Sequence, residues 1–404
     1  AGLTTALCLA EAGRPVTLIE ARRVGFGASG RNGGILGYGF PLEWDEIAAR
    51  LGQAEAREFL RLGRAGQGFV KDAIARHAIE CGPHPQGYLC GAWQDQPQAG
   101  RDYVAKQNER FGLELRWLSR DELAAEVTTP RYHGGFLDPA VSQIQPLRYC
   151  RGLARALVAA GGRLFEESPA LSLEKVGPAW QVRTPGGMAT AETLVLCGGG
   201  YLGRLHPANG RACIGVATHI AGTKPLGAER LARAIRTPRA LSDDRRAGAY
   251  YRPLADTRLV WGGRLTMPWE RGSGGTAAKI RHWIEYTYPA LGPVEMEVGW
   301  HGLMSFGRSR MVPLGQLPDG AWYAFGFGGS GLASTAVAGQ LLAGAIVRTS
   351  DEWRRFAPFG LGWMGGSLGN LAARMVYSGY RLGDWAADRR AVVKRITARG
   401  RRAA

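Results

Sequence analysis

Lysine is scarce in this chain of 404 residues, because only six of its 51 basic residues are Lys and the rest are Arg. The formal net charge of +17 raises nucleic-acid binding as a hypothesis, since clustered cationic side chains bind phosphates. The Arg residues, however, are dispersed through every segment without an interleaved aromatic stripe. We therefore expect a cationic, solvated surface and no nucleic-acid partner.

Cysteine is also sparse, with six residues and no C-x-x-C pair or neighbouring His pair. This pattern predicts reduced thiols, a cytoplasmic protein, and neither a disulfide framework nor a metal site. Long apolar runs are lacking too: the longest, over residues 336–347, is too short to cross a bilayer, and Gly and Gln interrupt it. No signal peptide is visible, although the chain begins inside a motif.

The first 34 residues have the pattern of a dinucleotide-binding unit. Residues 3–11 carry apolar side chains at helical spacing, Gly13 ends that helix, and residues 16–19 form a short apolar strand. Gly2 then corresponds to the third glycine of G-x-G-x-x-G, and Glu20 to the acid that accepts hydrogen bonds from a ribose. The fingerprint is partial, so we expect that strand one and two glycines lie upstream of the sequence given.

A glycine-rich segment over residues 27–34 (GASGRNGG) suits a backbone that folds tightly around phosphate and sugar. With Glu20 and Ala21 it resembles the FAD-dependent amine and amino-acid oxidases of the D-amino-acid oxidase superfamily, within the branch of the gamma-glutamylputrescine, glycine and sarcosine oxidases. Further matches follow in the family's order: residues 194–201 (LVLCGGGY), 251–253 (YRP) and 326–332 (GFGGSGL).

The resemblance implies an α/β fold, α+β overall, with a discontinuous Rossmann-like FAD-binding domain and a mainly antiparallel-β substrate domain. Residues 1–75, 141–211 and 311–350 would form the FAD-binding domain, and residues 76–140 and 212–310 the substrate domain. Residues 351–404 would be an extension, with a helix over 371–385. Its basic tail, residues 389–402, is interpreted as disordered or as a contact with a partner or anionic lipid.

The resemblance further implies FAD as the cofactor. We expect it to be non-covalent, because residues 299–330 contain no Cys that could tether it. Without the upstream strand, the sequence as given is expected to bind FAD poorly. The residues implied to contact FAD are Gly2, Glu20, Ala21, Ser29, Gly30, Arg31, Asn32, Gly33, Gly34, Ala170, Cys197, Gly198, Gly199, Gly328, Gly329, Ser330, Gly331 and Leu332.

The implied reaction is oxidation of the C–N bond of an amine or amino acid: hydride transfer to flavin N5 gives an imine that hydrolyses, and oxygen reoxidises the flavin with release of hydrogen peroxide. The flavin carries this chemistry, so no catalytic triad is required. Tyr251 and Arg252, from the family hairpin, and His301 and Arg308, before the glycine loop, are the candidate substrate contacts. An Arg with a Tyr hydroxyl suits a substrate carboxylate. Core packing or surface charge is the alternative for each residue.

Two departures from the family pattern leave other functions open. Ser330 stands where a His is usual, and Lys224 replaces an acid in the linker before the substrate domain. A non-catalytic FAD-binding subunit is one alternative. A flavin dehydrogenase that passes electrons to a protein or quinone is another, and the basic tail would help it to dock. A pyridine-nucleotide dehydrogenase is disfavoured, because it would not require the glycines of residues 326–331.

Overall fold

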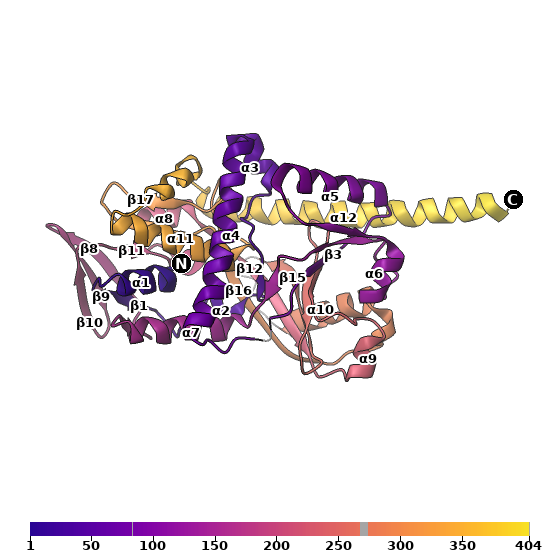
Figure 1. Ribbon diagram of the computed structural model, residues 1–404, viewed down its shortest axis with the longest axis horizontal. Coiled ribbons are helices and arrows are strands. Elements are labelled where there is room, and N and C mark those ends of the chain that lie inside the picture. Colours follow the sequence, from indigo (N-terminus) through magenta and orange to yellow (C-terminus); the bar gives the residue numbers. More distant parts are fainter. Residues whose placement is uncertain (83, 267–273, 404) are drawn as a thin grey trace. The chain divides into compact units, whose positions relative to one another are not determined.

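The computed structural model describes residues 1–82, 84–266 and 274–403, and the chain divides into two units (Figure 1). Unit 1 is built from residues 1–82, 144–217 and 302–370. Unit 2 is built from residues 83–143, 218–301 and 371–404. Three elements contribute residues to both units: β12 (Ile214–Thr223), β16 (Met296–Phe306) and α12 (Gly366–Ala403).

Unit 1 combines helices with short strands. Its helices are α1 (Gly2–Glu11), α2 (Ala28–Arg31), α3 (Trp44–Leu51), α4 (Gln53–Arg76), α7 (Pro146–Ala159), α8 (Pro207–Ala212) and α11 (Gly331–Ile346), with 3-10 turns at Gly199–Tyr201 and Glu352–Phe359. Its strands are β1 (Thr17–Ile19), β2 (Ile35–Leu36), β7 (Arg163–Phe165), β8 (Ser172–Val176), β9 (Ala179–Thr184), β10 (Gly187–Ala191), β11 (Val195–Leu196), β17 (Leu314–Gln316) and β18 (Trp322–Ala324).

Helix α11 lies at the centre of the unit 1 core. Its sequence is apolar and small on nearly all sides, which is the pattern of a buried helix. A Cβ at Gly339 would come within 2.5 Å of Thr4 in α1, and a Cβ at Gly66 in α4 would come within 2.4 Å of the Ala333 carbonyl. Glycine at these positions therefore allows both helices to approach α11 closely.

Unit 1 contains two pairs of parallel strands, and within each pair the carboxyl ends of the two strands are level. Strand β1 pairs with β7, so that Ile19 is level with Phe165. Strand β11 pairs with β18, so that Leu196 is level with Tyr323. Ligands of α/β sheets bind beyond the carboxyl ends of parallel strands. The residues after β1, β11 and β18 are therefore the ones to consider as a cofactor site.

Unit 2 is dominated by one mixed sheet, in the order β16-β12-β15-β14-β13-β3-β5-β4. Strand β14 pairs antiparallel with β13 and β15, and β5 pairs antiparallel with β3 and β4, while β13 and β3 are parallel. Its other elements are β3 (Tyr88–Gly91), α5 (Pro97–Phe111), β4 (Arg116–Leu118), α6 (Arg120–Glu126), β5 (Gly135–Asp138), β6 (Ser142–Gln143), α9 (Ala228–Ala232), β13 (Ala240–Asp243), β14 (Tyr250–Pro253), β15 (Leu259–Thr266), α10 (Gly274–Thr287) and a 3-10 turn at Pro289–Leu291.

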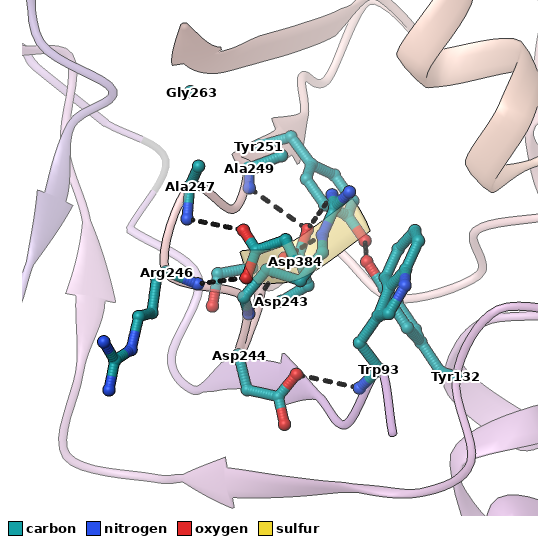
Figure 2. A network of polar contacts seen from close by, with 12 residues as sticks. Trp93, Tyr132, Asp243, Asp244, Arg246, Ala247, Ala249, Tyr251, Gly263 and Asp384 are labelled. Atoms are coloured by element: carbon teal, nitrogen blue, oxygen red, sulfur yellow. Dashed lines mark hydrogen bonds and ion pairs between the residues drawn. The ribbon is translucent and has the colours of Figure 1, made fainter. Parts of the chain in front are cut away.

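A buried ion pair joins this sheet to the turn that follows β13 (Figure 2). Asp243 lies 2.8 Å from the Arg245 Nε, and the two side chains are 0% and 7% exposed. Asp243 also accepts a hydrogen bond of 3.1 Å from the Ala249 backbone N–H. The Arg245 guanidinium lies 3.7 Å from the centre of the Trp93 ring and 4.7 Å from that of Trp283. Asp243 therefore neutralises a cation that aromatic rings enclose.

We expect Asp243→Ala to lower the free energy of unfolding by about 3–5 kcal/mol, because it removes the carboxylate that neutralises the buried Arg245. Asp256→Ala is the matched control, since Asp256 forms a more exposed ion pair with Arg258 at 2.8 Å and should cost about 0–1 kcal/mol. Urea unfolding of both variants measures the difference. Equal destabilisation by the two substitutions would contradict this assignment.

Candidate functional site

All the residues that the sequence predicts to contact FAD lie in unit 1. The start of α1 lies against the segment that follows β11, because a Cβ on Gly2 would be 3.3 Å from the Cys197 Cβ. Helix α1 has neither a side-chain N-cap nor an acidic residue in its first turn. Its free N–H groups and positive end thus suit an anionic group such as a pyrophosphate.

Glu20 follows β1 directly, where the fingerprint predicts the ribose-binding acid. Its Oε1 accepts a hydrogen bond of 2.9 Å from the Arg22 backbone N–H. The backbone N–H of Glu20 bonds to the Phe165 carbonyl at 2.9 Å and its carbonyl accepts from Ser168 at 2.9 Å. The backbone of Glu20 is thus fixed to the last residue of β7 and to the chain that follows it. Ala170, half-buried and just before β8, belongs to that same stretch.

The glycine-rich segment forms a short helix, α2, and a side-chain-stabilised turn. Asn32 closes the turn, because its Nδ2 donates to the Ser29 carbonyl at 2.9 Å and its Oδ1 accepts from the Gly34 N–H at 2.8 Å. A Cβ at Gly30 would lie 2.2 Å from the Gly25 carbonyl oxygen, so only glycine fits there. The Arg31 guanidinium lies 4.8 Å from the centre of the exposed Phe26 ring.

The loop between β18 and α11 is fixed by a residue that the sequence motifs do not mark. Ser305 accepts the Gly326 N–H on its Oγ at 2.9 Å and the Gly328 N–H on its carbonyl at 2.9 Å. Gly326 and Gly328 have φ angles of +72° and +50°, in the region that favours glycine. No motif indicates Ser305, because its contacts are to residues more than 20 positions further along the chain.

Helix α11 begins at the end of this loop with another open N-terminus. Ser330 is its N-cap residue but makes no capping side-chain hydrogen bond, and the first turn holds no acid. Added Cβ atoms at Gly329 and Gly331 would meet no heavy atom within 4 Å. Uncapped helix starts and open glycines fit a large anionic cofactor. The residues of unit 1 are therefore compatible with FAD.

Among the candidate substrate contacts, Arg252 is the one arginine with a buried guanidinium nitrogen in the described part of the chain. It lies on β14 in unit 2, and its Nη1 is 3.5 Å from the Gln143 Oε1. Its Nε is buried and makes no hydrogen bond within the described part of the chain. Desolvation by burial lowers the pKa of Arg252 to about 10, so the side chain remains cationic at neutral pH. A half-buried cation whose buried Nε is an unused donor fits an anionic ligand.

Tyr251 points to the opposite face of β14, because side chains alternate along a strand. Its ring stacks on Trp261 with centroids 3.9 Å apart, and its hydroxyl lies 2.7 Å from that of Tyr132 and 2.6 Å from that of Tyr288. Burial raises the pKa of Tyr251 well above its usual value. This geometry gives Tyr251 and Trp261 a role in core packing, and a substrate contact by Tyr251 remains only a prediction.

Tyr250 shares the face of Arg252 and was not among the sequence candidates. Its hydroxyl is 3.5 Å from the Thr218 Oγ1, and burial raises its pKa, so it stays a neutral donor at neutral pH. Strand alternation applied to residues 250–253 would have identified it. Gln143, which is 1% exposed and donates to the Pro238 carbonyl at 2.8 Å, lies far from any motif in the sequence.

The remaining candidates lie at exposed positions. His301 is on β16 in unit 2, with its ring centroid 5.6 Å from that of His219. Arg308 belongs to unit 1, where its side chain lies against Gly362. Lys224, which departs from the family pattern, forms an exposed ion pair of 2.7 Å with Glu295. His301 and Lys224 therefore have neighbours within unit 2, and Arg308 has one within unit 1.

No group of three or more His, Cys, Asp or Glu side chains among the described residues is arranged to hold a metal ion. No helix within the described ranges is long and apolar enough to span a membrane.

Comparisons with known proteins identify the family of the chain. The family model described as DAO, FAD dependent oxidoreductase, matches residues 1–345. Gamma-glutamylputrescine oxidoreductase of Escherichia coli (strain K12) is 32% identical over 360 residues, covering 88% of this chain and 83% of that protein. The probable oxidoreductase OrdL of Rhizobium meliloti (strain 1021) is 30% identical over 352 residues, covering 87% and 82%.

Solved structures support the same fold. Glycine oxidase from Geobacillus kaustophilus superposes with a TM-score of 0.73 at 20% identity, covering 89% of this chain and 95% of that one. L-proline dehydrogenase from P. horikoshii gives a TM-score of 0.72 at 16% identity, covering 89% and 96%. The expected mixed α/β fold is thereby confirmed, as are the enzyme class and the FAD cofactor. The chain belongs to the DAO family of FAD-dependent oxidoreductases.

Proposed function

We propose that the protein oxidises the C–N bond of an amine that carries a carboxylate, such as an amino acid, with oxygen as the electron acceptor. Arg252 is the observation that carries this proposal, because it is a cation with a buried, unused Nε and no acid beside it in the described structure. The relatives named for gamma-glutamylputrescine and for glycine suggest an amine or an amino acid as the substrate.

The proposal assigns separate tasks to the two units. Unit 1 would hold non-covalent FAD, with the start of α1 facing the pyrophosphate, Glu20 accepting from the ribose and the loop before α11 contacting the flavin. Unit 2 would hold the substrate. We propose the same division into an FAD-binding and a substrate-binding domain as the sequence suggests. Residues 371–404 then belong to the substrate-binding unit, because they are part of unit 2.

When bound, FAD would supply the redox chemistry: its N5 would accept the hydride from the carbon next to the nitrogen, and oxygen would take up the two electrons and become hydrogen peroxide. Arg252 would bind the substrate carboxylate through its Nε, while Gln143 restrains the other side of the guanidinium. The neutral hydroxyl of Tyr250, whose pKa burial raises further above neutral pH, would donate a hydrogen bond on the same strand face. The imine product hydrolyses to a carbonyl compound and an amine or ammonia.

The location proposed for this chemistry is the cytoplasm. All six cysteines are free, and Cys81, Cys90 and Cys150 are buried. Burial raises the pKa of Cys150 to about 11, which favours the unreactive thiol. Cysteines usually remain reduced thiols in a reducing compartment such as the cytoplasm.

Anaerobic mixing of the FAD-loaded protein with a panel of amino acids and amines tests the function. We expect a carboxylate-bearing amine to bleach the flavin absorbance, and air to restore it with one hydrogen peroxide for each substrate oxidised. Bleaching without peroxide, but with reduction of a quinone, would indicate a dehydrogenase. A flavin that no compound bleaches would favour a non-catalytic FAD-binding subunit.

A further inference from the structure

Helix α12 places its polar side chains toward the protein and its apolar side chains toward solvent. Three residues, Tyr377, Tyr380 and Asp384, form a contact stripe along one side of the helix. A second set, Leu371, Met375, Leu382 and Trp385, forms an outer stripe. A surface helix of a soluble protein normally has the reverse arrangement, with its apolar side facing the core.

The contact stripe is fixed to unit 2 by specific polar contacts (Figure 2). The carboxylate of Asp384 accepts hydrogen bonds from the Ala247 N–H at 2.9 Å and the Arg246 N–H at 3.4 Å. The Tyr377 hydroxyl accepts from the Leu265 N–H at 3.2 Å and donates to the Gly263 carbonyl at 3.4 Å. The orientation of the helix about its own axis is therefore set.

The outer stripe lies on the other side. At about 100° per residue, Leu371, Met375 and Leu382 are roughly 180° from the centre of the contact stripe, and Trp385 is beside them. These four side chains are 51%, 62%, 66% and 57% exposed. Exposed apolar side chains that gather on one helix face mark an interaction surface.

The positive charge of the residues that follow the outer stripe in the sequence indicates an anionic partner. The segment over residues 389–402 contains seven Lys and Arg residues and no Asp or Glu. The side chains of residues 388–403 lie outside the described part of the structure, so only their sequence enters here. An apolar stripe that runs into a basic cluster matches a bilayer surface rich in anionic lipid.

A second copy of the chain fits these observations less well. Heptad spacing of apolar residues, counted from the exposed Leu368, is interrupted at Ser378 and meets Arg389 after three repeats, so it only reaches the lower limit for a stable coiled coil. Side-by-side tails with seven positive charges each would also repel one another. We therefore propose that α12 lies on the surface of an anionic membrane, with its outer stripe inserted at the lipid boundary.

Cosedimentation with vesicles tests this proposal on the full FAD-loaded chain. We expect binding to vesicles of phosphatidylcholine mixed with phosphatidylglycerol, loss of binding at high salt, and little binding to phosphatidylcholine alone. Leu382→Glu should weaken binding about tenfold, and the double change Arg389→Glu, Arg390→Glu by at least about 30-fold. Met188→Glu is the matched control: Met188 is also apolar and exposed, at 53%, but lies on β10 of unit 1, and its change should leave binding intact.

Several results would overturn the proposal. They are absent binding to anionic vesicles, equal binding to neutral ones, and an equal effect of Leu382→Glu and Met188→Glu. Sedimentation equilibrium that shows a dimer split by Leu382→Glu would instead assign the outer stripe to a second copy. None of these measurements depends on turnover, so the outcome is separate from that of the proposed reaction.

Discussion

Replacement of Arg252 by Met is expected to lower kcat/KM for a carboxylate-bearing amine by about 10²–10³-fold, which is the usual cost of removing one partner of a buried charged pair. The FAD content should be unchanged, because Arg252 lies in unit 2 and the predicted FAD contacts lie in unit 1. The same substitution should have much less effect on an analogue in which the carboxylate is absent. Steady-state assays of both substrates measure the difference.

Arg258→Met is the matched control for this prediction. Arg258 precedes β15, but its Nη1 already has a carboxylate partner, Asp256, at 2.8 Å. Its loss should therefore leave kcat/KM unchanged. Arg252→Lys should recover only part of the activity, because an ammonium lacks the planar pair of donors. If Arg252→Met lowered the rates of both substrates equally, carboxylate binding by Arg252 would be wrong.

Gly328→Ala should weaken FAD binding by at least about tenfold. Gly328 has a φ of +50°, and left-handed backbone costs a residue with a Cβ about 1–2 kcal/mol. An added Cβ would also lie 3.0 Å from the Phe306 Cε1 and 3.3 Å from the Pro41 Cβ. The loop before α11 would have to shift away from its hydrogen bonds to Ser305. Flavin absorbance after dialysis against increasing FAD measures the affinity.

Gly177→Ala is the matched control, because it introduces similar backbone strain at a position outside the predicted cofactor site. Gly177 has a similar φ of +58°, lies in the turn between β8 and β9 of unit 1, and has no heavy atom within 4 Å of an added Cβ. This variant should lose stability by a comparable backbone cost and keep its FAD affinity. Equal loss of FAD from the two variants would mean that the loop of Gly328 does not hold the cofactor.

Much of the local structure follows from the sequence. Residues 43–77 have a sequence typical of long helices, and the structure divides them into α3 and α4 at Gly52, whose φ of +91° interrupts a continuous helix. The expected helix over residues 371–385 lies within α12. Apolar spacing and glycine positions carry this information, because the conformation of a short segment depends mainly on its own residues. The family assignment also came from motifs that are contiguous in the sequence.

The tertiary structure decided the contacts that no local pattern contains. It placed Gly2 against Cys197, linked Ser305 to the glycine loop, and assigned Tyr251 to the core while Arg252 kept an unused donor. It also turned the apolar side of α12 away from the protein. Periodicity in a sequence fixes which residues share a face, but which face is buried depends on side chains from distant segments that pack against it.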